Sequence, residues 1–176
     1  MLRTNRKIAA AATGAVLLTA GGLGAVPASA ATPASSVATC RTADLQASLQ
    51  EPLAGGMNHA GYTLQLKNTS SHTCALRGYP GLALENARHE VLSTDTNWGS
   101  TWYAKDPGKK TIYLEPGRTA EANLAWTHTR SNARHAAFLQ VTPPGATTHR
   151  TIAFSDYVDN GRLDVTALAH DVPVNG

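Results

Sequence analysis

The sequence predicts an all-β protein: a single antiparallel β-sandwich that follows an N-terminal export signal. Three observations predict this class. Apolar side chains alternate with polar ones along most of the chain, and turn residues separate these runs about every 8–12 residues. No window holds a sustained helical stripe of apolar side chains. About eight or nine short strands are therefore expected.

The first thirty residues have the composition of a secretory signal peptide. A basic start is followed by an apolar run over residues 8–23 and by the A-x-A cleavage site at residues 28–30. The run is too short and too rich in Gly and Ala to predict a membrane span. We expect cleavage after Ala30 and no membrane span afterwards, so the protein should be secreted, in the extracellular space or associated with the cell envelope.

The signal segment also carries the net charge. The chain has 15 Lys+Arg against 12 Asp+Glu, and three of the cations lie in the signal: Arg3, Arg6 and Lys7. Without them the chain is formally neutral, which gives no reason to expect nucleic acid or anionic lipid as a partner. The rest is long enough for one domain with a core. We expect a flexible leader over residues 31–39, the sandwich over residues 40–172 and a tail over residues 173–176.

Each expected strand is an alternating run that ends at turn residues. The clearest run has Tyr62, Leu64 and Leu66 on one face, with polar residues between them. In chain order, the expected strands centre on residues 45–49, 62–66, 74–76, 82–84, 112–114, 120–126, 137–141, 152–154 and 163–165. Turn residues stand at 68–71, 79–81, 115–117 and 143–145. This spacing favours an immunoglobulin-like, Greek-key sandwich.

The two cysteines, Cys40 and Cys74, are interpreted as a disulfide. A single pair in an exported protein is best explained by a bridge. Closing a loop of this length contributes about 3–4 kcal/mol in the chain-entropy account. Cys74 lies on the leucine-bearing face of an expected central strand, and Cys40 lies just before the first strand. The bridge would therefore tie the N-terminal edge to the core.

Several stretches of the chain resemble one family. CRTADLQASL, YTLQLKNTSSHTCALRGYPGLAL, LEPGRTAEANLAW, LQVTPPG and GRLDVTAL are similar to the DUF4232 family of secreted actinobacterial domains of unknown function, over residues 40–168. The resemblance implies an exported or envelope-associated β-sandwich and brings no established activity or catalytic residues. Many members of that family carry a second cysteine pair in the C-terminal half. In this chain, the position of one of those cysteines would be taken by Asp159 or by Asn160.

Catalytic and metal-binding patterns are sparse. Neither G-x-S-x-G nor H-E-x-x-H occurs, and the seven histidines are scattered. His72 and Cys74 form the one close His/Cys pair, while Met57 and His59 would give two ligands at most. We expect no catalytic residue, no metal and no cofactor, and hence a non-catalytic binding or interaction module. The alternatives are an extracellular enzyme with a spatially assembled site and a purely structural envelope protein.

Residues 93–110 lack clear alternation and hold the candidate binding surface. We expect three aromatic side chains to be exposed on a long loop, with three lysines as a polar rim: Trp98, Trp102, Tyr103, Lys105, Lys109 and Lys110. The two tryptophans share strand parity and Tyr103 opposes them, so at least one should be exposed unless the segment folds back over the core. A cell-wall glycan or an extracellular protein would suit this surface. The alternative is a tryptophan that caps the sandwich, with solvated lysines.

Overall fold

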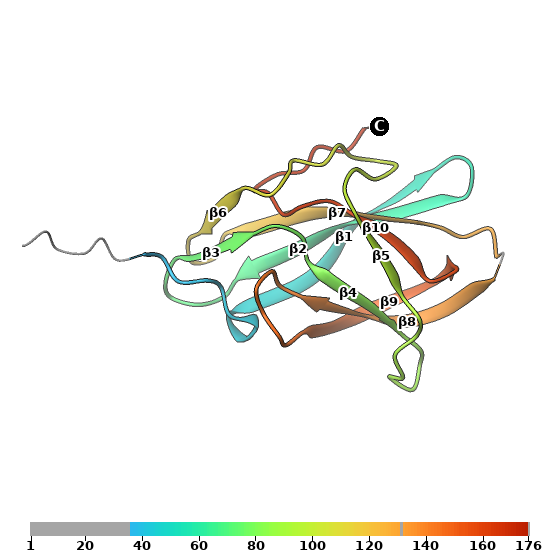
Figure 1. Ribbon diagram of the computed structural model, residues 1–176, viewed down its shortest axis with the longest axis horizontal. Helices are drawn as coiled ribbons and strands as arrows, with labels where there is room; N and C mark the ends of the chain where they lie inside the picture. Colours follow the sequence, from blue (N-terminus) through green and yellow to red (C-terminus); the bar gives the residue numbers. More distant parts are fainter. Residues whose placement is uncertain (1–35, 131, 176) are drawn as a thin grey trace, which may run out of the picture. The chain divides into compact units, whose positions relative to one another are not determined.

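A computed structural model of the chain describes residues 36–130 and 132–175 (Figure 1). The expected signal peptide, its cleavage site and residues 31–35 of the expected leader lie outside the described residues. Within the described ranges, the regular structure consists of ten strands and one three-residue 3-10 helix, η1 (Thr42–Asp44). The all-β class is therefore confirmed, with one strand more than the sequence indicated.

The strands form three sheets (Figure 1). The largest has the order β1-β2-β7-β10-β5, with β1 (Leu45–Gly55), β2 (His59–Asn68), β7 (Thr119–Thr127), β10 (Arg162–Val165) and β5 (Asp95–Trp98). The second has the order β4-β8-β9, with β4 (Gly81–Glu85), β8 (Ala133–Thr142) and β9 (Arg150–Asp159). The third pairs β3 (Cys74–Arg77) with β6 (Thr111–Leu114). Since β9 contacts β1, β7 and β10, and β4 contacts β5, the second sheet packs on the first as a sandwich.

The core lies between the two larger sheets. Leu64 and Leu66 of β2 are completely buried, as their alternation predicts. Trp126 of β7 meets Phe154 of β9 edge to face, with ring centroids 4.9 Å apart, and Tyr62 lies against both rings. Burial of each such apolar side chain contributes about 1.5–3 kcal/mol. This aromatic cluster fixes the two sheets against each other.

One strand was missed and makes the sandwich less regular than expected. Residues Asp95–Trp98 form β5, which runs parallel to β10, whereas we expected a loop here and antiparallel pairing throughout. β5 has no alternating apolar face. It lies at the edge of the sheet, where backbone pairing with β10 holds it. Gly161 permits this pairing: its φ is +68°, and a Cβ there would lie 2.1 Å from the Ser93 carbonyl oxygen.

The predicted disulfide between Cys40 and Cys74 is confirmed, with a sulfur–sulfur distance of 2.05 Å. Both cysteines are buried. Contrary to expectation, β3 is not a central strand: it pairs with β6 on one edge and makes a single bridge, to Thr39, on the other. The Ala75 amide donates to the Ala38 carbonyl and the Cys40 amide to the Ala75 carbonyl, both at 2.9 Å. The last residues of the expected leader are thus part of the folded domain.

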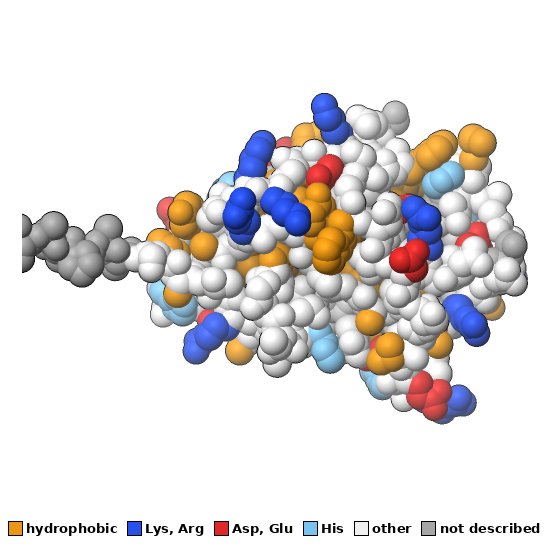
Figure 2. Space-filling model, viewed as in Figure 1, with side chains coloured by type: hydrophobic (Ala, Val, Ile, Leu, Met, Phe, Trp, Pro, Cys, Tyr) orange, Lys and Arg blue, Asp and Glu red, His pale blue; other side chains and the backbone are white. Residues whose placement is uncertain are grey.

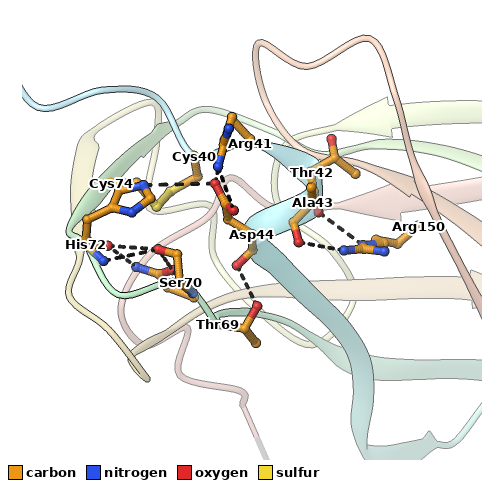
Figure 3. A network of polar contacts seen from close by, with 11 residues as sticks. Cys40, Arg41, Thr42, Ala43, Asp44, Thr69, Ser70, His72, Cys74 and Arg150 are labelled. Atoms are coloured by element: carbon orange, nitrogen blue, oxygen red, sulfur yellow. Dashed lines mark hydrogen bonds and ion pairs between the residues drawn. A yellow bond between two sulfur atoms is a disulfide. The ribbon is translucent and has the colours of Figure 1, made fainter.

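A single arginine holds the turn that follows Cys40. Figure 3 shows the Arg150 side chain, from the start of β9, directed at the carbonyls of this turn. Its guanidinium donates to the carbonyl oxygens of Thr42 and Leu45 at 3.0 Å and of Ala43 at 2.8 Å. Carbonyls at the end of a helical turn lack partners within the turn. Arg150 supplies those partners and joins the start of β1 to β9.

Asn68 organises the turn between β2 and β3. Its side chain is completely buried, and its amide nitrogen donates to the carbonyls of His72 and Leu114, each at 2.8 Å. Its oxygen accepts from the Ser70 amide at 2.9 Å and the Ser70 hydroxyl at 2.7 Å. An asparagine can thereby replace the backbone pairing that a turn interrupts.

A buried carboxylate, that of Asp159, stands at the end of β9. Asp159 accepts hydrogen bonds from the Thr129 amide at 2.8 Å and the Thr129 hydroxyl at 2.6 Å. Burial raises the pKa of Asp159, but hydrogen bonds from Thr129, Thr127 and Arg130 together outweigh it and leave the pKa below its usual value. Hydrogen bonds therefore tie the end of β9 to the connection after β7.

Candidate binding surface

The structure separates the three aromatic residues of the candidate surface. Trp98, the last residue of β5, is 56% exposed, and Trp102, four residues further on, is 51% exposed. Tyr103 is buried, with 6% exposure, so its expected place on the exposed surface was wrong. The two exposed tryptophans are an even number of residues apart and the buried Tyr103 is offset by one, as strand alternation would have it, although only Trp98 lies within a strand.

Tyr103 is buried because it folds back over β2. A Cβ at Gly61 would lie within 3.0 Å of the Tyr103 ring and 2.6 Å from the Leu124 carbonyl oxygen. Only glycine lets the ring approach this closely. The Tyr103 hydroxyl donates to the His59 carbonyl at 2.8 Å, and the Tyr103 carbonyl accepts from the Asn175 amide at 2.7 Å. Tyr103 thus anchors the segment after β5 and part of the expected C-terminal tail.

Further hydrogen bonds hold the same segment to the sheet. The Thr101 hydroxyl donates to the side-chain oxygen of Asn123, which is buried in β7, and accepts from the Tyr103 and Ala104 amides. Asp106 accepts from the Ala167 amide at 2.8 Å. A segment held at three places is pre-ordered, so a ligand that binds it loses little conformational entropy. The exposed tryptophans stand on a fixed support rather than on a mobile loop.

Trp98 stacks on a ring from another part of the chain. Its ring lies parallel to that of Tyr79, with centroids 5.6 Å apart and planes inclined by 7°. Tyr79 donates its hydroxyl proton to Asp106 at 2.6 Å, and this hydrogen bond, together with burial, raises the pKa of Tyr79. The Lys109 ammonium lies 5.5 Å from the centre of the Tyr79 ring, within the range of a cation–π contact.

Trp102 forms a separate stack. Its ring lies on His59, at the start of β2, with centroids 3.9 Å apart and planes inclined by 12°. Each tryptophan of the described segment therefore has its own stacking partner, and no ring contact joins the two tryptophans. The expected single surface is two surfaces: one around Trp98 and one around Trp102.

The three lysines are all exposed, but only Lys109 among them lies over an aromatic ring. Lys110 immediately precedes β6, whose first residue, Thr111, pairs with Arg77 at the end of β3. Figure 2 shows Lys and Arg side chains gathered beside an apolar patch, at the place where Figure 1 has the end of β3 and β5. We call Trp98, Tyr79, Lys109, Lys110 and Arg77 the Trp98 surface.

Sequence reasoning missed two members of the Trp98 surface. Tyr79 was interpreted only as part of a turn, and Arg77 was not singled out. A signal for Arg77 was present, because it alternates with the buried Cys74 and Leu76 and must point outward. No local pattern indicates that the Tyr79 ring meets Trp98, since that contact depends on how β3 and β5 are placed.

The polar clusters elsewhere tie strands and turns together. The Glu85 carboxylate, with 5% of its side chain exposed, lies 2.8 Å from the Nδ1 atom of His89 and accepts a second hydrogen bond from Gln140. The bond from His89, followed by that from Gln140, lowers the pKa of Glu85. His89 also stacks on Phe138 of β8, at 4.0 Å between centroids. This cluster fastens the turn after β4 to β8.

Metal-ligand geometry is absent from the part of the chain that the structure describes: no three His, Cys, Asp or Glu residues lie close enough together to hold a metal ion. Cys74 is engaged in the disulfide and has no thiolate to offer alongside His72. Met57 is 78% exposed, and His59 is covered by Trp102. The described residues also include no helix with the length and apolar character needed to cross a membrane.

Comparison with known proteins gives one match. A family model described as a domain of unknown function (DUF4232) matches residues 40–169. That range holds both cysteines, all ten described strands and the whole Trp98 surface. No curated protein and no solved structure matches the chain.

Proposed function

The chain belongs to the DUF4232 family of domains of unknown function, and from this premise we propose that it is a secreted, non-catalytic binding module. It would act at the cell envelope or in the extracellular space. The signal-like N-terminus supports export. The Cys40–Cys74 disulfide is compatible with an oxidising compartment.

One observation carries the binding role. Two tryptophans expose half or more of their surface from a segment that partly buried hydrogen bonds hold in place. Large aromatic side chains are costly to leave in water, and in clusters they mark contact surfaces. Tryptophan also dominates the energetics of many interfaces, because it offers a large rigid area with little loss of entropy.

The test measures retention of the exported chain by its own cell envelope. The full chain is produced in a secreting host, purified from the medium and incubated with washed envelope material. The retained fraction is then compared for the wild type, Trp98→Ala and Trp102→Ala. Tyr113→Ala is the matched control, because Tyr113 is 55% exposed on β6, outside the segment that follows β5.

We expect at least one tryptophan substitution to lower retention strongly while the control and the wild type stay equal. Unfolding midpoints should be nearly unchanged, since both side chains are about half exposed. Equal retention of all four proteins would refute the proposal. So would a large loss of stability with unchanged retention, which would assign the tryptophans to packing. Time-dependent release of fragments from the envelope material would refute the non-catalytic part.

A further inference from the structure

We propose that the Trp98 surface recognises an acidic polysaccharide, with sugar rings lying on its aromatic stack and their carboxylates facing its cations. This inference rests on the proposed function and adds the class of ligand. It depends on three properties of the Trp98 surface: the parallel rings, the balance of charge around them and the small apolar area.

The rings suit the flat apolar face of a sugar. Trp98 and Tyr79 are parallel within 7°, and Trp98 leaves 56% of its surface open to solvent. The C–H bonds of a pyranose face carry partial positive charge, which an aromatic π-face attracts. Tyr79 cannot rotate freely, because its hydroxyl is held by Asp106 at 2.6 Å. The stack is therefore ready for a sugar ring without rearrangement.

The charge around the rings is positive. Lys109 lies over the Tyr79 ring, Lys110 follows it directly in the chain, and Arg77 lies two positions before Tyr79 and opposite Thr111. The nearby acidic residue, Asp106, is engaged by the Tyr79 hydroxyl and the Ala167 amide, so its carboxylate already has partners. Figure 2 shows Lys and Arg side chains beside an apolar patch in this region of the surface. The protein without its signal is formally neutral, so this local excess is not a consequence of overall charge.

The small exposed aromatic area of the Trp98 surface favours a glycan over a folded protein as its ligand. A fully exposed aromatic side chain offers about 150–250 Å², so a half-exposed tryptophan with its partner ring offers on the order of 200 Å². A stable protein interface buries roughly 800 Å² on each partner around an apolar centre. Two rings bordered by cations fall well short of that, but they match one or two sugar units. A polymer can then gain affinity by occupying the surface repeatedly.

The test compares two polymers that share one sugar backbone and differ in whether its carboxyl groups are charged. Polygalacturonate carries a carboxylate on each sugar, and its fully methyl-esterified form has the same backbone without the charge. Binding of the exported full chain to each is measured by affinity electrophoresis and by tryptophan fluorescence, at low salt and at about 0.5 M NaCl, where exposed charges are screened. The variants are Trp98→Ala and the double substitution Lys109→Gln/Lys110→Gln. The matched controls are Tyr113→Ala and Lys67→Gln, both at exposed positions on other strands.

We expect binding to polygalacturonate and at least tenfold weaker binding to the methyl ester. Trp98→Ala should weaken binding about tenfold or more. The double lysine substitution should weaken it several-fold and reduce its salt dependence, while both controls leave it unchanged. Equal binding to the two polymers, or no binding to polygalacturonate, would overturn the inference. If Trp98→Ala still lowers envelope retention in that case, the binding module stands and its ligand is a neutral glycan or a protein.

Discussion

Replacement of Asn68 by alanine should destabilise the protein by about 3–5 kcal/mol. The side chain is completely buried and makes four hydrogen bonds. Each contributes about 1 kcal/mol net, and a buried group left without a partner costs about 1–3 kcal/mol more. The Leu114 carbonyl is the group at risk, because Leu114 is itself completely buried, whereas Ser70 and His72 are near water.

The assay is urea unfolding of the purified chain with the disulfide intact, followed by tryptophan fluorescence. Ser71→Ala, at an exposed neighbouring position, should change the free energy of unfolding by less than about 0.5 kcal/mol. Asn68→Asp keeps the volume and the acceptor but removes the donor, so at neutral pH it should be at least as harmful as alanine. If Asn68→Ala lowers the free energy of unfolding by less than about 1 kcal/mol, a loss similar to that of Ser71→Ala, the hydrogen-bond account is wrong.

Three further predictions concern stability. Replacing Cys40 and Cys74 by serine should lower the free energy of unfolding by about 2–4 kcal/mol, and an unchanged urea midpoint would contradict the loop-closure reasoning. The pKa of Glu85 is lowered in the folded state, so its contribution to stability is present above the unfolded pKa and is lost as the pH falls through the folded pKa. Stability of the wild type should therefore fall more steeply than that of Glu85→Gln below about pH 4.5, and parallel curves would exclude this role. Gly61→Ala should destabilise by about 1–3 kcal/mol, because the methyl group would meet the Leu124 carbonyl oxygen and the Tyr103 ring, and wild-type stability would show that both neighbours yield freely.

Much of the fold could be predicted from the sequence because each buried strand carries its own alternation. Leu64 and Leu66 are buried in β2, and the turn at Asn68 lies where its residue types place it. β5 could not be found in this way. Its residues Asp95–Trp98 lack an apolar face, and they are extended because β10 lies alongside them. Pairing of that kind is decided by the assembled sheet and leaves no local signal.

The candidate surface could be predicted only in part, for a similar reason. The exposure of Trp98 and Trp102 follows from their positions, but the burial of Tyr103 depends on the absence of a side chain at Gly61, forty-two positions earlier in the chain. The stacking of Trp98 on Tyr79 likewise joins the end of β5 to the connection between β3 and β4, nineteen positions earlier in the chain. Periodicity reports which way a side chain points and says nothing about what it meets.

The position of the disulfide also determines how the domain would respond to a mechanical load. Cys40 is bonded to Cys74, so residues 41–73, with β1 and β2, lie inside a covalently closed loop. A pull between the N-terminal chain and any point after Cys74 passes through the sulfur–sulfur bond directly into β3. The load bypasses β1 and β2, the pair that begins the large sheet. While the bond is intact, tension on the N-terminal side cannot extend these strands, and reduction would expose them to the full force.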